Sequence, residues 1–402
     1  MSLFAPLQGI VDSLAADIRR DVAIDDRQIR WIVHSPHYGE PDAARLESIL
    51  SRRVSDEAVA WAFSFGIQEA EGPVRLPANE DVGALARVCI PLRTRGLLLG
   101  FMFIVDPQSS LTGEEVGRAS AAAGEAAEVL YRERRLRDLE RERERWLLVH
   151  LLGDDEADAI DAARALGDEG FLDARRAAVL VIRAYEPEDR TAAELAIGGA
   201  LERLRRAVPD RGGLETSRPE HGAFVVSLDD GGGPSPRELA EKLVVLADEE
   251  GPAGLVTRIG IGGVVELADA HRSFRQARDA VGVAERIERF GRIAAWDELG
   301  VYRTLARFAD DLDAESLHPG LLALLSDPAH APLVETLAAY LDRAGDAKST
   351  AEALSLHRAT LYYRLSRVEE LTGARLKSGD DRLALHLGLR LARLGGFPSS
   401  GS

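Results

Sequence analysis

The sequence predicts a multidomain α+β protein that ends in an all-α region. Three observations predict this fold class. Strand-like and helical segments alternate over most of the first 295 residues, a highly charged stretch around residue 130 has only helical features, and no strand pattern follows Trp296. With 402 residues, the chain is long enough for two or three domains that each bury a core of their own.

The bulk composition is that of a globular protein, with 46% hydrophobic and 29% charged residues. With a formal net charge of -17, the chain as a whole does not attract the negatively charged DNA backbone. Any DNA-binding site must therefore be a local patch of Lys and Arg. The single cysteine, Cys89, excludes a disulfide framework and a cysteine-based zinc site. The first twenty residues lack a signal-peptide pattern, and the most apolar window, residues 97–105, is too short to cross a membrane. We therefore expect a cytoplasmic protein that does not bind a membrane.

Residues 1–110 have the pattern of a first α+β domain. A strand is predicted over residues 28–35, helices over residues 44–66, and a hairpin over residues 86–105 with its turn at Arg95 and Gly96.

Residues 111–152 predict a long linker helix. Thr112 and Glu115 have the spacing of a capping box, and an alanine-rich run follows them. Further along, a narrow apolar stripe runs between charges of both signs and consists of Leu130, Leu136, Leu139, Trp146 and Leu147. Such a helix either pairs with a copy of itself or lies solvated on its own domain, and the broken heptad leaves both possibilities open.

Residues 165–300 predict an α/β domain. Strands are expected over residues 177–185, 222–230 and 255–267, and they alternate with helices over residues 191–208, 234–251 and 269–287. The glycines at 260, 262 and 263 do not form a dinucleotide-binding fingerprint, because the third glycine of that motif is missing. They are interpreted instead as structural residues at the end of a strand.

Residues 301–396 predict only helices, with starts at Pro328 and Pro332 and C-terminal caps at Gly345 and Gly373. Within this region the apolar spacing defines three consecutive helices. The first is lined by Val334, Leu337, Ala338 and Leu341, the second by Ala347, Ala351 and Leu354 behind a cap at Asp346, and the third by Leu361, Leu365 and Val368. Short helices joined by a four-residue turn at residues 355–358 are typical of a helix-turn-helix.

The third of these helices has a basic and aromatic outer face. Between Leu356 and Val368 there are three arginines and no acid, although the whole chain has 67 acidic residues against 50 basic ones. In a major groove, Arg358 could reach guanine edges, and the side chains further along the helix could meet phosphates or bases. The predicted DNA-binding residues are Lys348, Ser349, His357, Arg358, Thr360, Tyr362, Tyr363, Arg364 and Arg367. His357 is either a weak helix cap or a DNA contact. A plain three-helix bundle with solvated arginines is the structural alternative.

The stretch from Leu333 to Leu394 resembles the C-terminal helix-turn-helix domain of the PucR/CdaR family of bacterial transcription regulators. The resemblance rests on three segments, LVETLAAYLDRAGD, TAEALSLHRATLYYRLSRVEELTG and DDRLALHLGLRL. The family usually has Asn where this chain has Ala359, which removes one possible contact with a base or a phosphate. On the last segment, His386 is interpreted as a packing residue of a helix whose Leu383, Leu387, Leu391 and Leu394 face the core.

The middle domain resembles the GGDEF-like domain of the same family. Active diguanylate cyclases need metal-binding carboxylates and a Gly-Gly turn, but this chain has Pro219, Glu220, His221 and Gly222 at that place. The resemblance therefore implies a degenerate, non-catalytic GGDEF-like domain.

The first domain resembles a GAF-type sensor, a fold that encloses small ligands between a sheet and helices. The residues expected to line such an effector site are Trp31, His34, Trp61 and Cys89, with simple core or surface packing as the alternative for each. His34 and His37 are too few to bind a metal ion.

Together these features predict a homodimeric regulator that binds double-stranded promoter DNA and senses a small-molecule effector through its first domain. We expect no catalytic residue, no metal ion and no cofactor. The competing hypothesis is a signalling enzyme or nucleotide-binding protein that uses the GGDEF-like domain.

Overall fold

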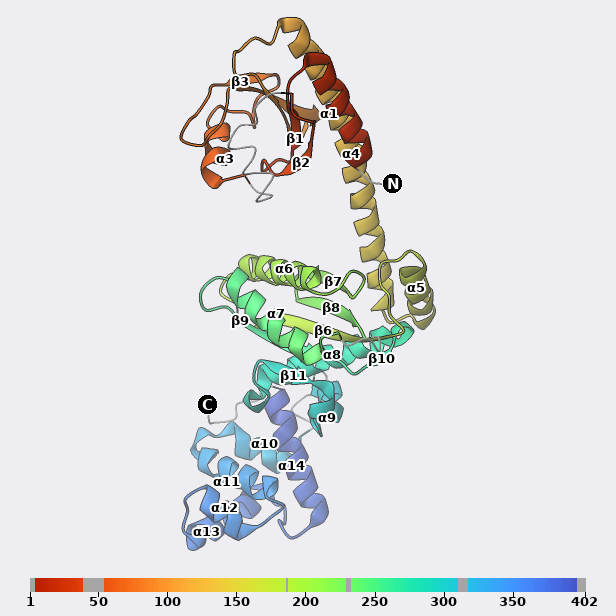
Figure 1. Ribbon diagram of the computed structural model, residues 1–402. Helices are drawn as coiled ribbons and strands as arrows, with labels where there is room; N and C mark the ends of the chain where they lie inside the picture. The colour runs from red at the N-terminus through yellow and green to blue at the C-terminus, as the bar shows by residue number, and fades with distance from the viewer. Residues whose placement is uncertain (1–3, 39–53, 186, 229–232, 310–316, 396–402) are drawn as a thin grey trace. The chain divides into compact units, whose positions relative to one another are not determined.

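The computed structural model describes residues 4–38, 54–185, 187–228, 233–309 and 317–395. Of the helices predicted over residues 44–66, the part from 44 to 53 lies outside the described residues. The chain divides into two compact units, Met1–Glu142 and Arg143–Ser402, and each is described by itself (Figure 1). None of the helices in the described ranges is long and apolar enough to cross a membrane.

The first unit contains a five-stranded antiparallel sheet in the order β2-β1-β5-β4-β3. The strands are β1 (Val22–Asp25), β2 (Trp31–His34), β3 (Val74–Leu76), β4 (Arg87–Thr94) and β5 (Leu97–Val105), and the helices beside them are α1 (Phe4–Ile18) and α3 (Asp56–Phe63). The predicted hairpin is confirmed, because Arg95 and Gly96 connect β4 to β5 with φ angles of 51° and 79°. Two left-handed residues in succession match the right-handed twist of the paired strands.

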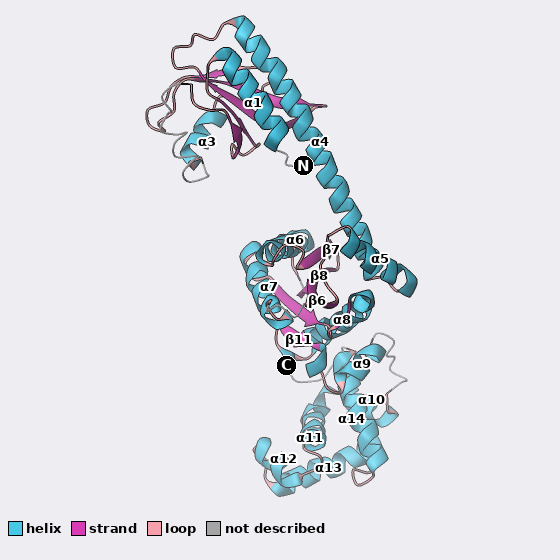
Figure 2. Cartoon of the chain, turned by 45° about the vertical axis from the view of Figure 1, so that its right-hand side comes forward, coloured by secondary structure: helices cyan, strands magenta, loops and turns pink. Residues whose placement is uncertain are grey.

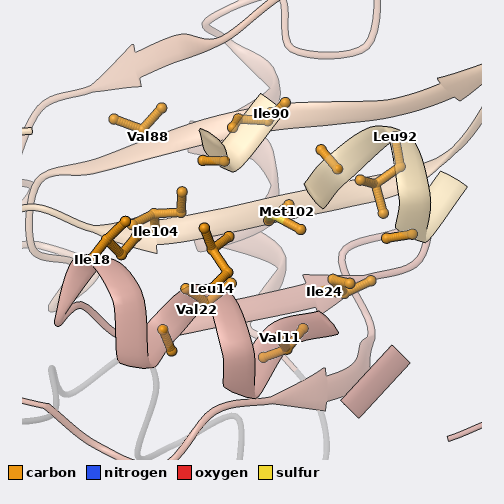
Figure 3. Packing of buried hydrophobic residues seen from close by; sticks show 14 of the residues in the cluster. Val11, Leu14, Ile18, Val22, Ile24, Val88, Ile90, Leu92, Met102 and Ile104 are labelled. Carbon is orange, nitrogen blue, oxygen red and sulfur yellow. The ribbon is translucent and has the colours of Figure 1, made fainter. Parts of the chain in front are cut away.

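The two faces of this sheet bury different cores because successive strand residues point to opposite sides. Toward α1 the sheet presents Val22, Ile24, Val88, Ile90, Leu92, Met102 and Ile104, which pack on Val11, Leu14 and Ile18 (Figure 3). Toward α3 it presents a second set, Leu76, Cys89, Phe101 and Phe103. The sheet is therefore a single layer between two separate apolar clusters.

Helix α4 (Gly113–Leu151) runs through the predicted linker as one continuous helix of 39 residues. Its capping box is confirmed, since the Glu115 carboxylate accepts from the Thr112 backbone N–H at 2.8 Å and the Thr112 hydroxyl accepts from the Glu115 N–H. The first half of α4 belongs to the core of the first unit through its small residues, Ala119, Ala123, Ala126 and Ala127. At the other end, Leu147, Leu148 and Leu151 are buried in the second unit. Between these ends Leu136 and Leu139 are each about half exposed.

The second unit begins with a six-stranded sheet whose main path is β11-β9-β6-β8-β7, with β10 paired to β6. Its elements are α5 (Glu156–Asp168), β6 (Arg176–Tyr185), α6 (Arg190–Ala207), β7 (Gly213–Arg218), β8 (His221–Ser227), α7 (Pro236–Glu250), β9 (Val256–Ile261), β10 (Val265–Glu266), α8 (Ala270–Arg286) and β11 (Ile293–Ala295). Helices α6 and α7 cover one face, and α8 packs on the other (Figure 2). The predicted α/β alternation is confirmed; α5 and β11 were not predicted.

Two glycines of the predicted strand end hold α8 against the sheet. A Cβ atom on Gly260 would lie 2.0 Å from the carbonyl oxygen of Ala277, and one on Gly262 would lie 2.0 Å from that of Ser273. Only glycine permits this approach of helix and strand backbones. These glycines therefore have a packing role, in agreement with the absence of a dinucleotide fingerprint.

The rest of the second unit is all-α, as predicted. Its helices are α9 (Tyr302–Ala309), α10 (Pro319–Ser326), α11 (Ala331–Asp342), α12 (Ala347–Ala353), α13 (Arg358–Thr372) and α14 (Gly379–Leu394). Helices α10 to α14 share one apolar cluster, which includes every apolar residue predicted to line α11 and α13. Helix α9 packs instead on α8 through Tyr302 and Leu305.

The predicted core face of α14 was wrong for two of its four leucines. Leu383 is 66% exposed and Leu387 is 40% exposed, while Leu385, Gly388, Leu389 and Ala392 are buried. Leucine stands at every second position from residue 383 to residue 391, so the sequence has apolar residues on more than one side of this helix. The periodicity alone could not select the buried side.

Candidate DNA-binding surface and effector cavity

Contacts within helix α12 and the turn after it fix the position at which α13 begins. Asp346 caps α12 by accepting from the backbone N–H groups of Lys348 at 2.9 Å and Ser349 at 3.3 Å. Thr350 is fully buried and donates its hydroxyl to the Asp346 carbonyl at 2.6 Å. In the turn, Ser355 adopts φ = 53°, and the chain then enters α13 at Arg358. These local contacts form a helix-turn-helix at the predicted place.

The cap of α13 is His357. Its Nδ1 atom accepts from the Ala359 N–H at 3.3 Å, so the ring acts as a helix cap although His is not a common capping residue. At the other end Gly373 adopts φ = 70° and closes the helix in the left-handed conformation. Both predicted boundaries of this helix are thus present.

The outer face of α13 is exposed along its whole predicted length. Leu361, Leu365 and Val368 are buried on the inner side. On the outer side Tyr363 is 71% exposed and Tyr362 is 48% exposed. The remaining exposed residues of this surface, which we call the α13 face, are Arg358, Ala359, Thr360, Ser366 and Arg367.

The three arginines of α13 have different surroundings. Arg358 lies over the Tyr362 ring at 5.5 Å and donates to its hydroxyl at 3.3 Å, which holds the guanidinium on the outer surface. Arg367 forms an exposed ion pair with Glu370 at 2.7 Å, which is a weak and exchangeable interaction. Arg364 turns inward and donates to the Thr336 hydroxyl at 3.2 Å and to the Pro332 carbonyl at 3.4 Å.

Arg364 therefore joins α13 to α11, and its half-buried side chain is less available to DNA than the sequence suggested. Beyond α13, Lys348 is exposed and Ser349 is half-buried at the start of α12. The structure brings the predicted DNA-binding residues together on α12, α13 and the turn between them.

His386 lies in a polar cluster rather than among core side chains. One ring nitrogen, Nε2, is 2.9 Å from the Asp342 carboxylate and 3.1 Å from Arg390 Nε. Arg390 also donates to the same carboxylate at 2.7 Å and to the Tyr302 hydroxyl at 3.1 Å. The packing role predicted for His386 is replaced by a polar link between α14, α11 and α9.

A cavity in the first unit contains three of the four predicted effector residues. Trp31, His34 and Trp61 line it, and its walls come from β1, β2, β4, β5 and α3. Trp31 is 44% exposed at this site, and the Arg87 guanidinium lies 5.9 Å from the centre of the Trp61 ring. The cavity is on the sheet face opposite to α1.

The cavity has two charged residues that sequence reasoning missed, Asp25 on β1 and Arg87 on β4. The strand β1 was not predicted, so Asp25 could not be placed. Arg87 could have been found, because it lies two residues before Cys89 and therefore points to the same side of β4.

Cys89 is not among the residues that line the cavity. It is fully buried in the cluster beneath α3, and burial raises the pKa of its thiol well above the usual range. The side chain is therefore a neutral core residue.

The turn of the β7–β8 hairpin occupies the place where a cyclase would have its signature. Arg218 pairs with His221, which leaves Pro219 and Glu220 as the two turn residues. Gly222 lies within β8, where a Cβ atom would come within 2.5 Å of Leu201 and 2.7 Å of Ile197. This glycine serves packing against α6 and does not form a nucleotide-binding turn.

Comparison with known proteins identifies two of the chain's domains. Residues 333–391 match the PucR C-terminal helix-turn-helix domain, and residues 152–283 match the GGDEF-like domain. The chain carries a PucR-type helix-turn-helix domain and a GGDEF-like domain. The resemblance to PucR/CdaR-type regulators is thereby confirmed, whereas the GAF likeness of the first domain and the domain boundaries stay predictions.

The chain is also similar to several curated transcription regulators. The chain is 22% identical to the DNA-binding transcriptional activator AdeR of Bacillus subtilis (strain 168), over 97% of this chain and 94% of AdeR. It is 20% identical to the proline-responsive transcriptional activator PutR of the same organism, over 97% of each chain. It is 31% identical to the carbohydrate diacid regulator of Escherichia coli (strain K12), over 39% of this chain and 40% of that protein.

Proposed function

We propose that this chain is a transcription regulator that binds promoter DNA through the α13 face of its PucR-type helix-turn-helix. The observation that carries the proposal is the exposure of Arg358, Tyr363 and Arg367 on a helix whose opposite side is buried. An exposed helix of this kind fits the major groove, where arginine can donate two hydrogen bonds to guanine. The similarity to transcriptional activators over nearly the whole chain supports the same function.

The individual contacts follow from the surroundings of each side chain. Arg358 is held at the N-terminal end of α13 by Tyr362, so it is the residue best placed to read a base edge. Arg367, Lys348 and Thr360 serve as phosphate contacts, and Arg367 must leave Glu370 to do so. Arg364 positions α13 against α11, and His357 caps the helix.

We expect Arg358→Ala and Arg367→Ala each to weaken DNA binding without loss of folding. The loss for Arg358→Ala should be about 1–3 kcal/mol, or roughly fivefold to 150-fold in affinity, because a base contact is removed. The Arg367→Ala variant should lose affinity for all DNA sequences alike. The slope of the logarithm of its binding constant against the logarithm of salt concentration should fall in magnitude by about one. The measurement is fluorescence anisotropy on DNA from upstream of the protein's own gene and on sites selected from a random library, at several salt concentrations.

The matched control is Arg393→Ala, which removes an exposed arginine from α14 on the same domain. Its affinity should equal that of the unmodified protein. Unchanged affinity for both α13 variants, with circular dichroism intact, would exclude the α13 face as the DNA-binding surface.

The protein is proposed to act as a homodimer, because a single helix-turn-helix seldom supplies enough contacts and two copies would read half-sites about 34 Å apart or a multiple of that distance. A small molecule in the cavity between β1, β2 and α3 is proposed as its signal. Cytoplasmic localisation fits this function.

Catalysis is not part of the proposed function. The turn at Pro219 and Glu220 lacks the Gly-Gly pair that an active diguanylate cyclase needs, and the named relatives are regulators. Incubation of the full chain with GTP and Mg²⁺ tests this point. Formation of a cyclic dinucleotide at a rate that scales with protein concentration would favour the enzyme hypothesis.

A further inference from the structure

An arginine-lined cleft lies on the outer side of α8. Along this helix Arg272, Arg275, Arg278 and Arg286 fall on one side, since their spacing follows the helical repeat. Arg183 of β6 and Arg307 of α9 complete the wall, and the cleft has a volume of about 780 Å³.

The charge of this cleft is opposite to that of the whole chain. Six guanidinium groups line it in a protein with a formal net charge of -17. Asp279 is the carboxylate among the lining residues, and it already interacts with another group of the protein. The rest of the lining is uncharged and includes Gln276, Gly282 and Val283.

Half of these arginines are paired with acidic residues and half are not. Arg183 lies 3.6 Å from Glu285, Arg272 lies 3.3 Å from Asp269, and Arg275 lies 3.9 Å from Asp154. Within the described residues, Arg278, Arg286 and Arg307 have no ion pair with a carboxylate. Arg183 is largely buried, and its Nε atom has no hydrogen-bond partner.

Such a concentration of like charge is unfavourable in the free protein. Cations that share a cleft repel one another, and a buried donor without a partner loses its hydrogen bond to water. An anion that enters the cleft would relieve both costs. Guanidinium groups are especially suited to phosphate, because they donate two parallel hydrogen bonds to it.

We propose that this cleft binds a small polyphosphate. The volume lies within the range of about 300–1,000 Å³ typical of small-molecule sites. Arg278 and Arg286 are eight residues apart, or about 12 Å along the helix, which fits a chain of linked phosphates better than a single one. A DNA duplex is too wide to enter a recess of this size, so DNA is the less suitable occupant.

This site goes beyond the proposed function, because it lies outside both the α13 face and the cavity of the first unit. The cleft also includes Ala306 of α9 and Leu394 of α14, both of which belong to the helical region. Helices α8, α9 and α14 share one apolar cluster. A bound polyphosphate would thus contact the junction between the GGDEF-like domain and the helical region.

Isothermal titration calorimetry of the full chain with tripolyphosphate, in buffer without magnesium, tests the proposal. Inorganic phosphate and citrate are the comparison ligands, because they distinguish a polyphosphate site from a single-phosphate site and from a tricarboxylate site. We expect tripolyphosphate to bind at least tenfold more tightly than either. The double variant Arg278→Gln/Arg286→Gln should lose at least tenfold in affinity.

The matched control is Arg206→Gln, which removes an arginine that is 71% exposed on α6. It should bind tripolyphosphate as the unmodified protein does. Arg307→Gln provides a second test on a different helix, with a smaller loss expected.

Absence of tripolyphosphate binding, equal affinity for citrate, or unchanged affinity in the folded double variant would each overturn the proposal. Loss of DNA affinity in the double variant without tripolyphosphate binding would assign these arginines to DNA instead. Because the α13 face is left intact in these variants, failure here is distinguishable from failure of the proposed function.

Discussion

His221 shows how single residues of this chain depend on their surroundings. The side chain is 9% exposed, and its ring packs against the Phe274 ring in a tilted arrangement with centroids 5.5 Å apart. Burial, with the nearby Arg183, Arg278 and Arg218, lowers the pKa of His221 from 6.5 to about 4, while Glu220 opposes the shift. The residue is therefore neutral in the folded protein at neutral pH.

The lowered pKa predicts a loss of stability in acid. The unfolded chain takes up a proton at His221 as the pH falls below about 6.5, whereas the folded chain does so only near pH 4. The contribution of neutral His221 to the free energy of unfolding is thus complete above pH 6.5. At pH 5 the free energy of unfolding should be lower by about 2 kcal/mol for this reason. Urea unfolding of the full chain and of His221→Phe at pH 7.5 and pH 5.0 measures it. If the difference in unfolding free energy between the two proteins stays constant with pH, the lowered pKa of His221 is contradicted.

Some residue roles could be predicted from the sequence and others could not. Exposure of Arg358, Tyr362 and Tyr363 follows from helical periodicity, because Leu361, Leu365 and Val368 fix the buried side. The inward turn of Arg364 depends on Thr336, which lies 28 positions earlier in the chain. Long-range partners of this kind leave no local signal in a single sequence.

At the level of elements, short apolar runs bounded by turn residues were sufficient to predict the strands of the hairpin β4–β5 and the strands β6, β8 and β9. The short strand β11 has three residues and depends on its parallel pairing with β9. The helix α5 buries only one long apolar side chain, Leu166, beside Ala159 and Ala162, and two alanines are a weak signal. Tertiary packing, rather than local pattern, decides these two elements.

Helix α4 offers the most direct test of self-association. Leu136 and Leu139 are 51% and 52% exposed in the highly charged middle stretch of this helix. If this stretch pairs with a second copy, Leu136→Glu/Leu139→Glu should convert the dimer to a monomer and lower DNA affinity at least tenfold. Light scattering gives the mass, and the anisotropy assay gives the affinity.

The control Arg141→Glu changes the net charge by the same amount as the double variant. It lies on the opposite side of α4, about 140° from Leu136. The control should remain dimeric. An unchanged mass in the double variant would instead support a solvated helix.

For the whole molecule, we propose that effector binding in the first unit and DNA binding in the second unit are energetically coupled. A ligand that changes the affinity for DNA must itself bind with an affinity that DNA changes by the same factor. Tryptophan is present at four positions, and two of them, Trp31 and Trp61, line the cavity of the first unit. Effector binding should therefore alter the intrinsic fluorescence of the full chain.

A screen of small metabolites by fluorescence and by DNA anisotropy tests this linkage. Trp31→Ala should abolish the response of DNA affinity to an active metabolite and leave affinity without the metabolite unchanged. Trp146→Ala removes an indole that is 52% exposed on α4 and does not line the cavity, and it should retain the response. A response that survives in Trp31→Ala would place the signal elsewhere.

The single-layer sheet of the first unit separates two kinds of evolutionary constraint. Along β1, Val22 and Ile24 support the core with α1 and α4, while Ala23 and Asp25 face the cavity. Neighbouring residues of β1 are therefore constrained by different requirements, namely core packing on one face and the lining of the cavity on the other. If the cavity binds the effector as proposed, substitutions at Ala23 or Asp25 should change which molecule is recognised and leave the core with α1 and α4 intact.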